Sequence, residues 1–295
     1  MMMDLVQALG SGILVGMVYA LLGLGVVIVF RASEAFNFAV GEFLVVGAFL
    51  FLVFYADLRL PILVALPLAL LAAGAVGGLI ERLTIKPLLG RSPISMTIVT
   101  LGLASVLRSL VQLVFGAHTY PFELRLPDIK LEIGGMLFLS EALWAGILSL
   151  VTFGLVILFL FQTRWGVAIR ATSESQAKAL AFGIDAGFIL FLVWMVSAVC
   201  IAISGVVISN FGSLSYVTGI VGLRAIPVVL IGGMDSIGGA LVGGIVVGVC
   251  EALVGAYIEP LGLIGFKEVA PYILLLIVLT FRPYGLFGTV RIERV

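Results

Sequence analysis

Three ionisable residues stand inside otherwise apolar stretches of this 295-residue chain and are its first candidates for chemistry: Glu42, Arg108 and Glu251. An ionisable side chain at the centre of a bilayer costs roughly 2.5–3.5 kcal/mol on insertion scales, so it faces a helix-bundle interior, water or a partner charge. Two interpretations follow. These residues line a route or gate through a membrane, or they form structural ion pairs near helix ends.

A polar cluster surrounds the first of these charges, in the run N-F-A-V-G-E that begins at Asn37 and ends at Glu42. A helix break in this run exposes backbone polar groups, which a membrane tolerates only where they are buried in protein or line a cavity. We therefore predict that this cluster and the other buried charges line a translocation pathway or its gate. The predicted residues are Asn37, Gly41, Glu42, Arg108 and Glu251.

Motifs for catalysis are missing from the sequence. It contains no GxSxG, HExxH or CxxC pattern, and no glycine-rich stretch has the GxxxxGK[ST] pattern of a nucleotide-binding loop. We interpret the lone His118 as a solvated loop residue, and Cys200 and Cys250 as small packing residues in apolar windows. We therefore expect no catalytic site, no metal site, no cofactor and no ATP binding by the chain itself.

The composition indicates that this chain lies in a lipid bilayer. Charged residues make up 11% and hydrophobic residues 62%, against roughly 25% and about half in soluble domains. Because 16 Lys and Arg balance 16 Asp and Glu, nucleic acid is excluded as a main partner. A bilayer core requires about 20 apolar residues of helix. Uncharged windows of that length cover residues 5–30, 60–80, 142–163 and 186–223.

We predict an all-α, polytopic bundle in a single transmembrane domain, residues 1–295, with about eight spanning helices. These lie near residues 5–30, 36–56, 60–80, 94–115, 141–162, 186–209, 236–256 and 268–281. The apolar stretch Ala225–Gly233 is too short to cross alone, at about nine residues against the ~20 required. We predict that it is a re-entrant or broken half-helix. The residues predicted to belong to this re-entrant segment are Arg224, Gly232, Gly233 and Asp235.

Glycine spacing predicts close helix contacts. The chain has 36 glycines, about 12% against a usual ~7%, and three pairs have GxxxG spacing: Gly12 with Gly16, Gly239 with Gly243, and Gly244 with Gly248. Such pairs let helix backbones approach closely in lipid, where no hydrophobic effect drives helices together. We expect helix interfaces at these positions.

Loop charges predict the orientation. Segments 81–91, 164–185 and 282–295 carry more basic than acidic residues and are expected in the cytoplasm. Segments 117–140 and 257–268 carry more acidic than basic residues and are expected outside.

The cytoplasmic segment 164–185 contains a second candidate site. Its composition predicts a short amphipathic helix over 171–182, with Ser173 as N-cap and Gln176 completing a capping box. Gly183 suits the helix stop. Two interpretations stand: the segment merely connects helices, or it docks into a soluble partner and passes motion to the bundle. The residues predicted for docking are Arg170, Glu174, Lys178 and Gly183.

Three stretches of the chain, in order, resemble a known family. They are GSGILVGMVYALLGLGVVIVFRASEAFNFAVGEFLVVGAF, ERLTIKPLLGRSPISMTIVTLGLASVLRSLVQLVFG, and LRAIPVVLIGGMDSIGGALVGGIVVGVCEALVGAYIEP followed by FRPYGLFG. Together they are similar to the permeases of branched-chain amino acid ABC transporters, H-type subunit, over nearly the whole chain. The segment Glu174–Ala181 with Gly183 matches the coupling loop of ABC permeases, although it reads E-S-Q-A where the usual pattern is E-A-A.

The resemblance implies a transport subunit in the bacterial or archaeal cytoplasmic (inner) membrane. Its implied partners are a second permease chain, identical or sister, two cytoplasmic ATP-binding subunits and an external solute-binding protein. The implied substrate is a leucine-, isoleucine- or valine-like amino acid. Sister families take up urea or short amides, which is one alternative. The other is a secondary transporter that uses Glu42, Arg108 and Glu251 as an ion-coupled relay.

Overall fold

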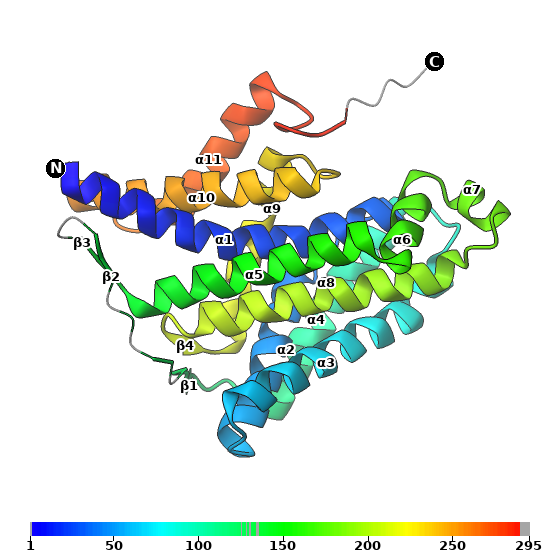
Figure 1. Cartoon of the computed structure of the whole chain (residues 1–295), viewed down its shortest axis with the longest axis horizontal. Helices are drawn as coiled ribbons and strands as arrows, with labels where there is room; N and C mark the ends of the chain where they lie inside the picture. The colour runs from blue at the N-terminus through cyan, green and yellow to red at the C-terminus, as the bar shows by residue number, and fades with distance from the viewer. Residues whose placement is uncertain (1, 125, 128, 130, 134–135, 290–295) are drawn as a thin grey trace. The chain divides into compact units, whose positions relative to one another are not determined.

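The computed structural model of the chain is predominantly helical, as the sequence predicts (Figure 1). The residues that it describes are 2–124, 126–127, 129, 131–133 and 136–289. The α-helices are α1 Met2–Ser33, α2 Val40–Leu52, α3 Ile62–Ile80, α4 Pro93–Phe115, α5 Ser140–Gln162, α6 Arg164–Glu174, α7 Gln176–Ala181, α8 Ala186–Ser209, α9 Ala225–Gly232, α10 Ile237–Tyr257 and α11 Phe266–Phe281.

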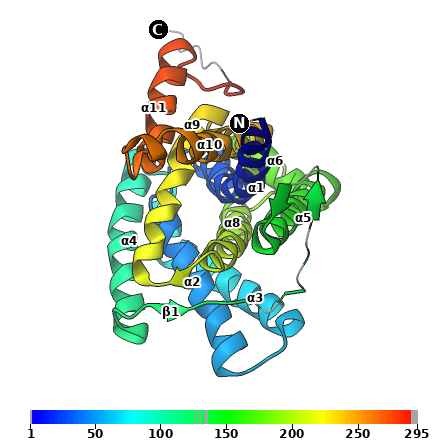
Figure 2. The same ribbon diagram turned by 90° about the vertical axis from the view of Figure 1, so that its left-hand side faces the viewer.

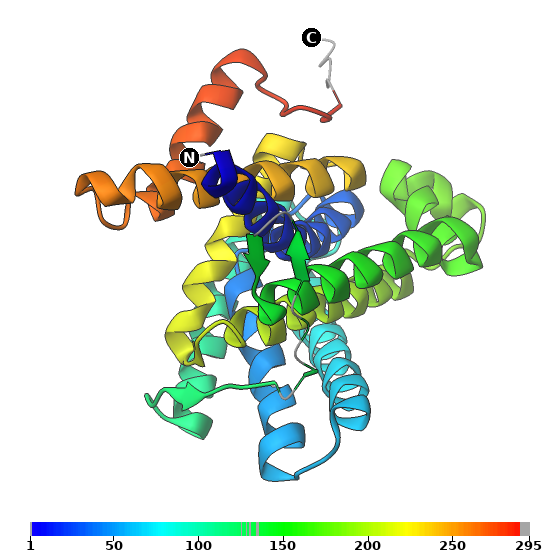
Figure 3. The same ribbon diagram turned by 60° about the vertical axis from the view of Figure 1, so that its left-hand side comes forward.

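Shorter elements extend or connect these helices. The π-helical segments are η1 Val53–Asp57 and η2 Glu81–Ile85, and the 3-10 segments are η3 Lys86–Leu88, η4 Tyr216–Arg224 and η5 Glu259–Leu261. The strands are β1 Tyr120–Pro121, β2 Leu131–Ile133, β3 Met136–Phe138 and β4 Ser213–Leu214. β1 pairs with β4, and β2 pairs with β3 as two antiparallel arrows visible in Figure 3. These strands are too short to form a sheet core.

Seven helices of the described part are long and apolar enough to cross a membrane. The predicted span 60–80 proves longer, because η2 and η3 continue α3 without a break as far as Leu88. The predicted cytoplasmic loop at 81–91 therefore begins as helix. The last predicted span is α11, whose 16 residues fall below the ~20 of a typical crossing.

The chain divides into two compact units. Unit 1 comprises residues 1–27, 124–150 and 224–295, and unit 2 comprises residues 28–123 and 151–223. The single transmembrane domain over residues 1–295 stays a prediction.

In unit 1, glycines let α1 and α10 pack backbone against backbone, and the two helices lie side by side in Figures 1 and 2. A Cβ atom added at Gly12 would lie 2.8 Å from the Cα of Val249, and one at Gly16 would lie 2.8 Å from the Cα of Ile245. A Cβ added at Gly248 would meet the carbonyl of Gly12. Two of the predicted GxxxG pairs therefore face each other. The third, Gly239 with Gly243, packs instead against α9.

Unit 2 is built around α2, which packs against α3, α4 and α8 (Figure 2). Small residues again set the contacts: a Cβ added at Gly47 would lie on Ala202 of α8, and one at Gly205 would meet the carbonyl of Leu44. α3 contacts α8 in the same way through Gly77, opposite Ala198. The close seams leave little room for polar side chains between these helices.

The predicted half-helix exists as α9, which ends at Gly233 with a φ of 109°. η4 leads directly into α9, and the two form one apolar helix over Tyr216–Gly232. Gly219 and Gly222 of η4 lie against the backbone of Gly41. These two glycines let η4 approach the start of α2 at backbone distance.

Candidate translocation site and coupling segment

The predicted helix break lies between α1 and α2, where residues 34–39 are not helical. Asn37 is 2% exposed, and its side-chain oxygen accepts the N–H of Ala39 at 3.0 Å, as in an Asx turn. Thr97 and Thr100 of α4 accept the N–H groups of two further residues of this segment. The broken backbone is therefore satisfied by side chains, as the membrane interior requires.

Glu42 and Arg108, two of the predicted charges, form one ion pair in unit 2. The Arg108 Nη2 and Nε atoms donate to the Glu42 Oε1 atom at 2.6 and 2.9 Å. The Glu42 side chain is 3% exposed and that of Arg108 is 51% exposed. The second carboxylate oxygen of Glu42 is buried and has no hydrogen-bond partner in the described part of the chain. The geometry gives an ion pair between α2 and α4, and a pathway-lining role stays a prediction.

The third predicted charge, Glu251 of α10, is the centre of a cluster in unit 1. The Tyr19 hydroxyl donates to Glu251 Oε2 at 2.7 Å, and Arg224 Nε donates to Glu251 Oε1 at 2.6 Å. The Arg224 guanidinium carbon lies 5.9 Å from the centre of the Tyr19 ring, within the range of a cation–π contact. Both oxygens of the carboxylate are therefore satisfied, and the start of α9 is fastened to α1 and α10.

Sequence reasoning missed Tyr19. The residue is 6% exposed, and a buried tyrosine hydroxyl usually finds a hydrogen-bond partner. A tyrosine in the middle of an uncharged 26-residue window was therefore the available signal that a polar group lies opposite it.

The C-terminal tail holds the end of α9. The N–H groups of Leu286 and Phe287 donate to the carbonyls of Ile231 and Gly232 at 2.8 and 3.0 Å. Gly233 packs against the backbone of Gly288. Because the last carbonyls of a helix have no partner within the helix, this tail supplies the missing donors.

Asp235 also binds the tail, through the backbone N–H of Thr289 at 3.2 Å and through the hydroxyl of the same residue. Of the four residues predicted to mark the half-helix, Gly232, Gly233 and Asp235 thus lie at its tail-bound end. Arg224 lies at its start, in the Glu251 cluster.

The predicted coupling helix starts in a different place. Ser173 is not its N-cap, because it lies inside α6 and donates its hydroxyl to the carbonyl of Ile169 at 2.9 Å. The N-cap is Thr163, whose side chain accepts the N–H of Gly166 at 3.0 Å. The helix then breaks at the extended residue Ser175 and resumes as α7. The helix cap therefore lies ten residues earlier than predicted, at a residue that directly follows α5.

The four predicted docking residues are spread over both helices. The guanidinium carbon of Arg170 lies 4.7 Å from the ring centre of Phe161 on α5, and Glu174 is exposed at the end of α6. Lys178 belongs to α7, but its side chain lies outside the described part. Gly183 has a φ of 77° and its N–H donates to the carbonyl of Leu180 at 3.0 Å, which confirms the predicted helix stop.

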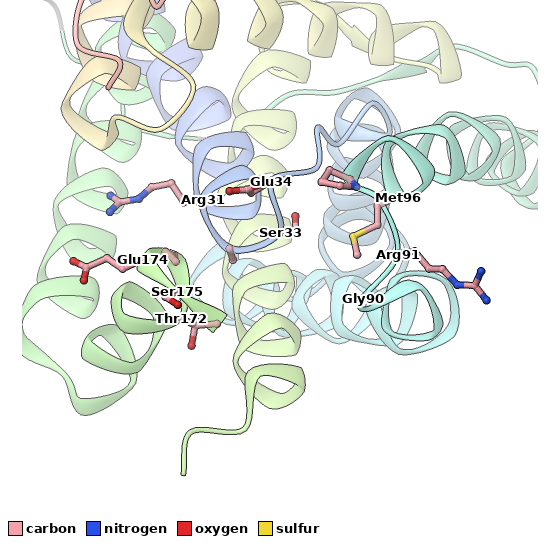
Figure 4. Close-up of a pocket in the computed structure, with 12 residues that line it drawn as sticks. Arg31, Ser33, Glu34, Gly90, Arg91, Met96, Thr172, Glu174 and Ser175 are labelled. Atoms are coloured by element: carbon pink, nitrogen blue, oxygen red, sulfur yellow. The ribbon is translucent and has the colours of Figure 1, made fainter. Parts of the chain in front are cut away.

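A cavity of about 230 Å³ in unit 2 lies beside this segment, where the ends of α1 and α6 meet the loop before α4 (Figure 4). Ser33, Glu34 and Met96 lie around it, whereas the side chains of Arg31 and Arg91 extend outward in opposite directions. Sequence reasoning missed this cavity because its three walls are far apart along the chain. The predicted coupling segment therefore shares this cavity with the end of α1 and the start of α4.

The described residues contain no group of three or more His, Cys, Asp and Glu side chains that could hold a metal ion, and Cys200 and Cys250 are free thiols. The buried ion pairs instead connect helices: Glu42 with Arg108 joins α2 to α4, and Glu251 with Arg224 joins α10 to the start of α9. An apolar helical bundle with a helix break, a 3-10 segment that leads into an apolar helix, and charges held in pairs defines the class: a multi-pass membrane protein.

Comparison with known proteins assigns the family. The sequence pattern of the family described as "Branched-chain amino acid transport system / permease component" matches residues 8–279. The chain belongs to this family.

Several curated relatives match almost end to end. The chain is 28% identical to the permease protein LivH of Salmonella typhimurium and 30% identical to BraD of Pseudomonas aeruginosa, each over 98% of this chain and 97% of the relative. Both are named as proteins of a high-affinity branched-chain amino acid transport system. A probable branched-chain amino acid permease of Methanocaldococcus jannaschii is 26% identical over 91% of this chain and 88% of its own length. No solved structure matches.

Proposed function

We propose that this chain is the permease subunit of an ATP-binding-cassette importer that carries branched-chain amino acids across the inner membrane of a bacterium or archaeon. The single observation that carries the proposal is the match of the family pattern over residues 8–279, with relatives of that name in bacteria and an archaeon. The partners are a second permease chain, two cytoplasmic ATP-binding subunits and an external solute-binding protein.

In this proposal, energy enters through α6 and α7. α6 is tied to α5 by Thr163 and by the contact between Arg170 and Phe161, and it packs against α8. The cavity beside α6 brings the same segment next to the ends of α1 and α4. A partner that binds two conformations of this segment with different free energy shifts the bundle between them. Each ATP-driven closure of the partner then moves the helix ends that border the pathway.

The pathway itself needs few polar groups, because the cargo is an apolar side chain with one ammonium and one carboxylate group. The helix break at Asn37 and the ion pair of Glu42 with Arg108 supply polar atoms in unit 2. Gly41, next to Glu42, packs directly on the carbonyl of Gly219, so η4 lies beside this polar region. We infer that this region meets the polar end of the substrate.

Reconstitution tests the proposal. The chain is placed in liposomes with its partner permease, ATPases and external binding protein, and uptake of radiolabelled leucine is followed with and without ATP. We expect uptake that requires ATP and the binding protein. Uptake driven by a proton or sodium gradient without ATP would contradict the proposal in favour of a secondary transporter. Uptake of urea that leucine does not compete with would reassign the substrate to urea or short amides.

A further inference from the structure

Glu81 is a buried carboxylate that the function described so far does not use. It continues α3 as the first residue of the π-helical segment η2, its exposed fraction is 0%, and neither carboxylate oxygen has a hydrogen-bond partner among the residues that the structure describes. The other carboxylates at membrane depth, Glu42 and Glu251, are each held by an arginine. An ionised carboxylate without a partner is strongly disfavoured in an apolar interior. π-helical turns inside α-helices are also frequent at functional sites.

Two nearby cations, Arg82 and Lys86, attract the Glu81 carboxylate from a distance, but no ion pair holds it among the described residues. Arg82 on its own segment and Lys86 of η3 are exposed, and neither lies within ion-pair distance of it in the described part of the chain. α8 carries no charged residue or histidine from Ala186 to Ser209, and Asp185 before it accepts the first N–H groups of that helix. The one charge of α4 is Arg108, which is bound to Glu42.

The helix packed against Glu81 holds an unpaired donor. Trp194 of α8 is 2% exposed, and its indole Nε1 atom is buried with no hydrogen-bond partner in the part of the chain that the structure covers. α3 and α8 run antiparallel, because Gly74 of α3 faces Val199 whereas Gly77, one turn later, faces Ala198 and the backbone carbonyl of Trp194. Glu81 follows Gly77 by one further turn, and helical side chains lean back toward the N-terminus of their helix. The register therefore brings the free acceptor and the free donor to the same stretch of this seam.

We propose that Glu81 is a proton-binding site in the membrane-embedded part of the chain, and that the Trp194 indole N–H stabilises its ionised form when the seam between α3 and α8 loosens. In the packed seam Glu81 is a neutral carboxylic acid. Loosening lets water and the indole N–H reach the carboxylate, and the proton leaves to water. The site does not depend on which substrate the chain carries.

The sign of the pH dependence follows from this assignment. The folded chain binds a proton at Glu81 that the unfolded chain releases at neutral pH, so stability falls as pH rises. Over the range in which the folded acid keeps its proton, the unfolding equilibrium constant rises about tenfold per pH unit from this group. Glu81→Gln lacks that contribution, because glutamine is neutral at every pH.

Infrared spectroscopy of the purified full chain in detergent tests the proposal directly. We expect the carbonyl band of a protonated carboxylic acid at neutral pH in the wild-type chain, and its loss in Glu81→Gln. The control is Glu123→Gln, an exposed carboxylate whose replacement leaves that band unchanged. Trp194→Phe removes the donor, so the acid band should persist to higher pH than in the wild-type chain.

Each alternative result overturns the proposal. If wild-type and Glu81→Gln chains give the same acid band, Glu81 is ionised. If Glu81→Gln fails to insert or unfolds at lower temperature at neutral pH, the carboxylate charge is required for folding, since glutamine reproduces the size and neutrality of the protonated acid. If Trp194→Phe leaves the pH dependence of the band unchanged, the indole does not stabilise the ionised form.

Discussion

At the scale of single residues, the energetics of this chain depend on how completely each buried charge is partnered. Glu251 is held through both of its oxygens, Glu42 through one, and Glu81 through neither. Removing one member of a buried pair costs more than the pair contributes, because the remaining charge stays buried without compensation. The three carboxylates should therefore respond differently to the same kind of substitution.

The Glu251 cluster gives the first prediction. Glu251→Ala leaves the Arg224 charge and the Tyr19 hydroxyl without their acceptor, and should lower the free energy of unfolding by about 3–5 kcal/mol. Tyr19→Phe removes one hydrogen bond and leaves the ion pair intact, so its cost should be about 2 kcal/mol. Denaturant unfolding in detergent, followed by circular dichroism, measures both. Equal costs would show that the ion pair adds nothing to the hydroxyl bond.

The ion pair of Glu42 with Arg108 gives the second prediction. Arg108→Ala leaves Glu42, at 3% exposure, as an unpaired buried acid, and should cost about 3 kcal/mol, at the low end of such losses because Arg108 is half exposed. Adding Glu42→Gln should restore part of that loss, since the glutamine carries no charge. The thermal unfolding temperatures of the single and double variants measure the loss and its partial recovery. A double variant less stable than Arg108→Ala would contradict the proposed origin of the cost.

The buried charges could be found from the sequence, but their partners could not. Glu42, Arg108 and Glu251 stand out because charge is rare in apolar windows. Arg108 is 66 positions from Glu42, and no local pattern encodes that distance. Glu81 escaped for a different reason: Arg82 and Lys86 beside it made the stretch look like a loop, although the helix continues through it.

At the scale of helices, close seams depend on glycines whose hydrogen atoms face another backbone. The GxxxG pairs and the stop at Gly183 could be predicted, because each depends on a local geometric requirement. The start of α6 could not, because Thr163 and Ser173 are both acceptable caps and the sequence does not rank them, whereas the structure uses Thr163. The cavity beside α6 depends on three distant segments and has no local signal at all.

A pair of substitutions on one helix tests the seam between α1 and α10. Gly244→Ala places a methyl group against the backbone of Ala20, and should lower the free energy of unfolding by about 1–3 kcal/mol through overpacking. Gly238→Ala on the same helix meets nothing within 4 Å, and should be neutral or stabilise by up to about 1 kcal/mol. Thermal midpoints in detergent compare the two. A similar loss in both variants would show that the contact with Ala20 does not set the effect.

Gly183 tests the coupling segment. Gly183→Val forces a β-branched residue to a φ of 77°, at a local cost of roughly 1–2 kcal/mol, and should lower the leucine taken up per ATP hydrolysed in the reconstituted complex. Gly183→Asn is the matched variant, because asparagine tolerates this backbone conformation, and it should keep most of the coupling. Uptake and hydrolysis are measured on the same liposomes. Full coupling in the valine variant would remove this turn from the docking surface.

At the scale of the whole molecule, the helix Tyr216–Gly232 decides the path of the chain through the membrane. Its 3-10 and α-helical parts rise about 2.0 and 1.5 Å per residue, which gives a length near the ~30 Å of a bilayer core. The structure thus makes a full crossing possible where the sequence alone predicts a re-entrant segment. If it crosses, α10 leads outward and segment 257–268 lies outside, in agreement with its acidic balance.

Cysteine labelling in whole cells separates the two paths. In a chain with Cys200 and Cys250 replaced by alanine, Ile264→Cys, at a position that is 92% exposed, should react with a membrane-impermeant maleimide from outside. Arg91→Cys, in the predicted cytoplasmic loop, should react only after the cells are opened. If 225–233 enters and returns, α10 must instead lead inward, and both cysteines would stay unlabelled until the cells are opened. Labelling of Ile264→Cys from outside therefore requires that Tyr216–Gly232 spans the membrane, provided that segment 164–185 is cytoplasmic, as a coupling segment must be.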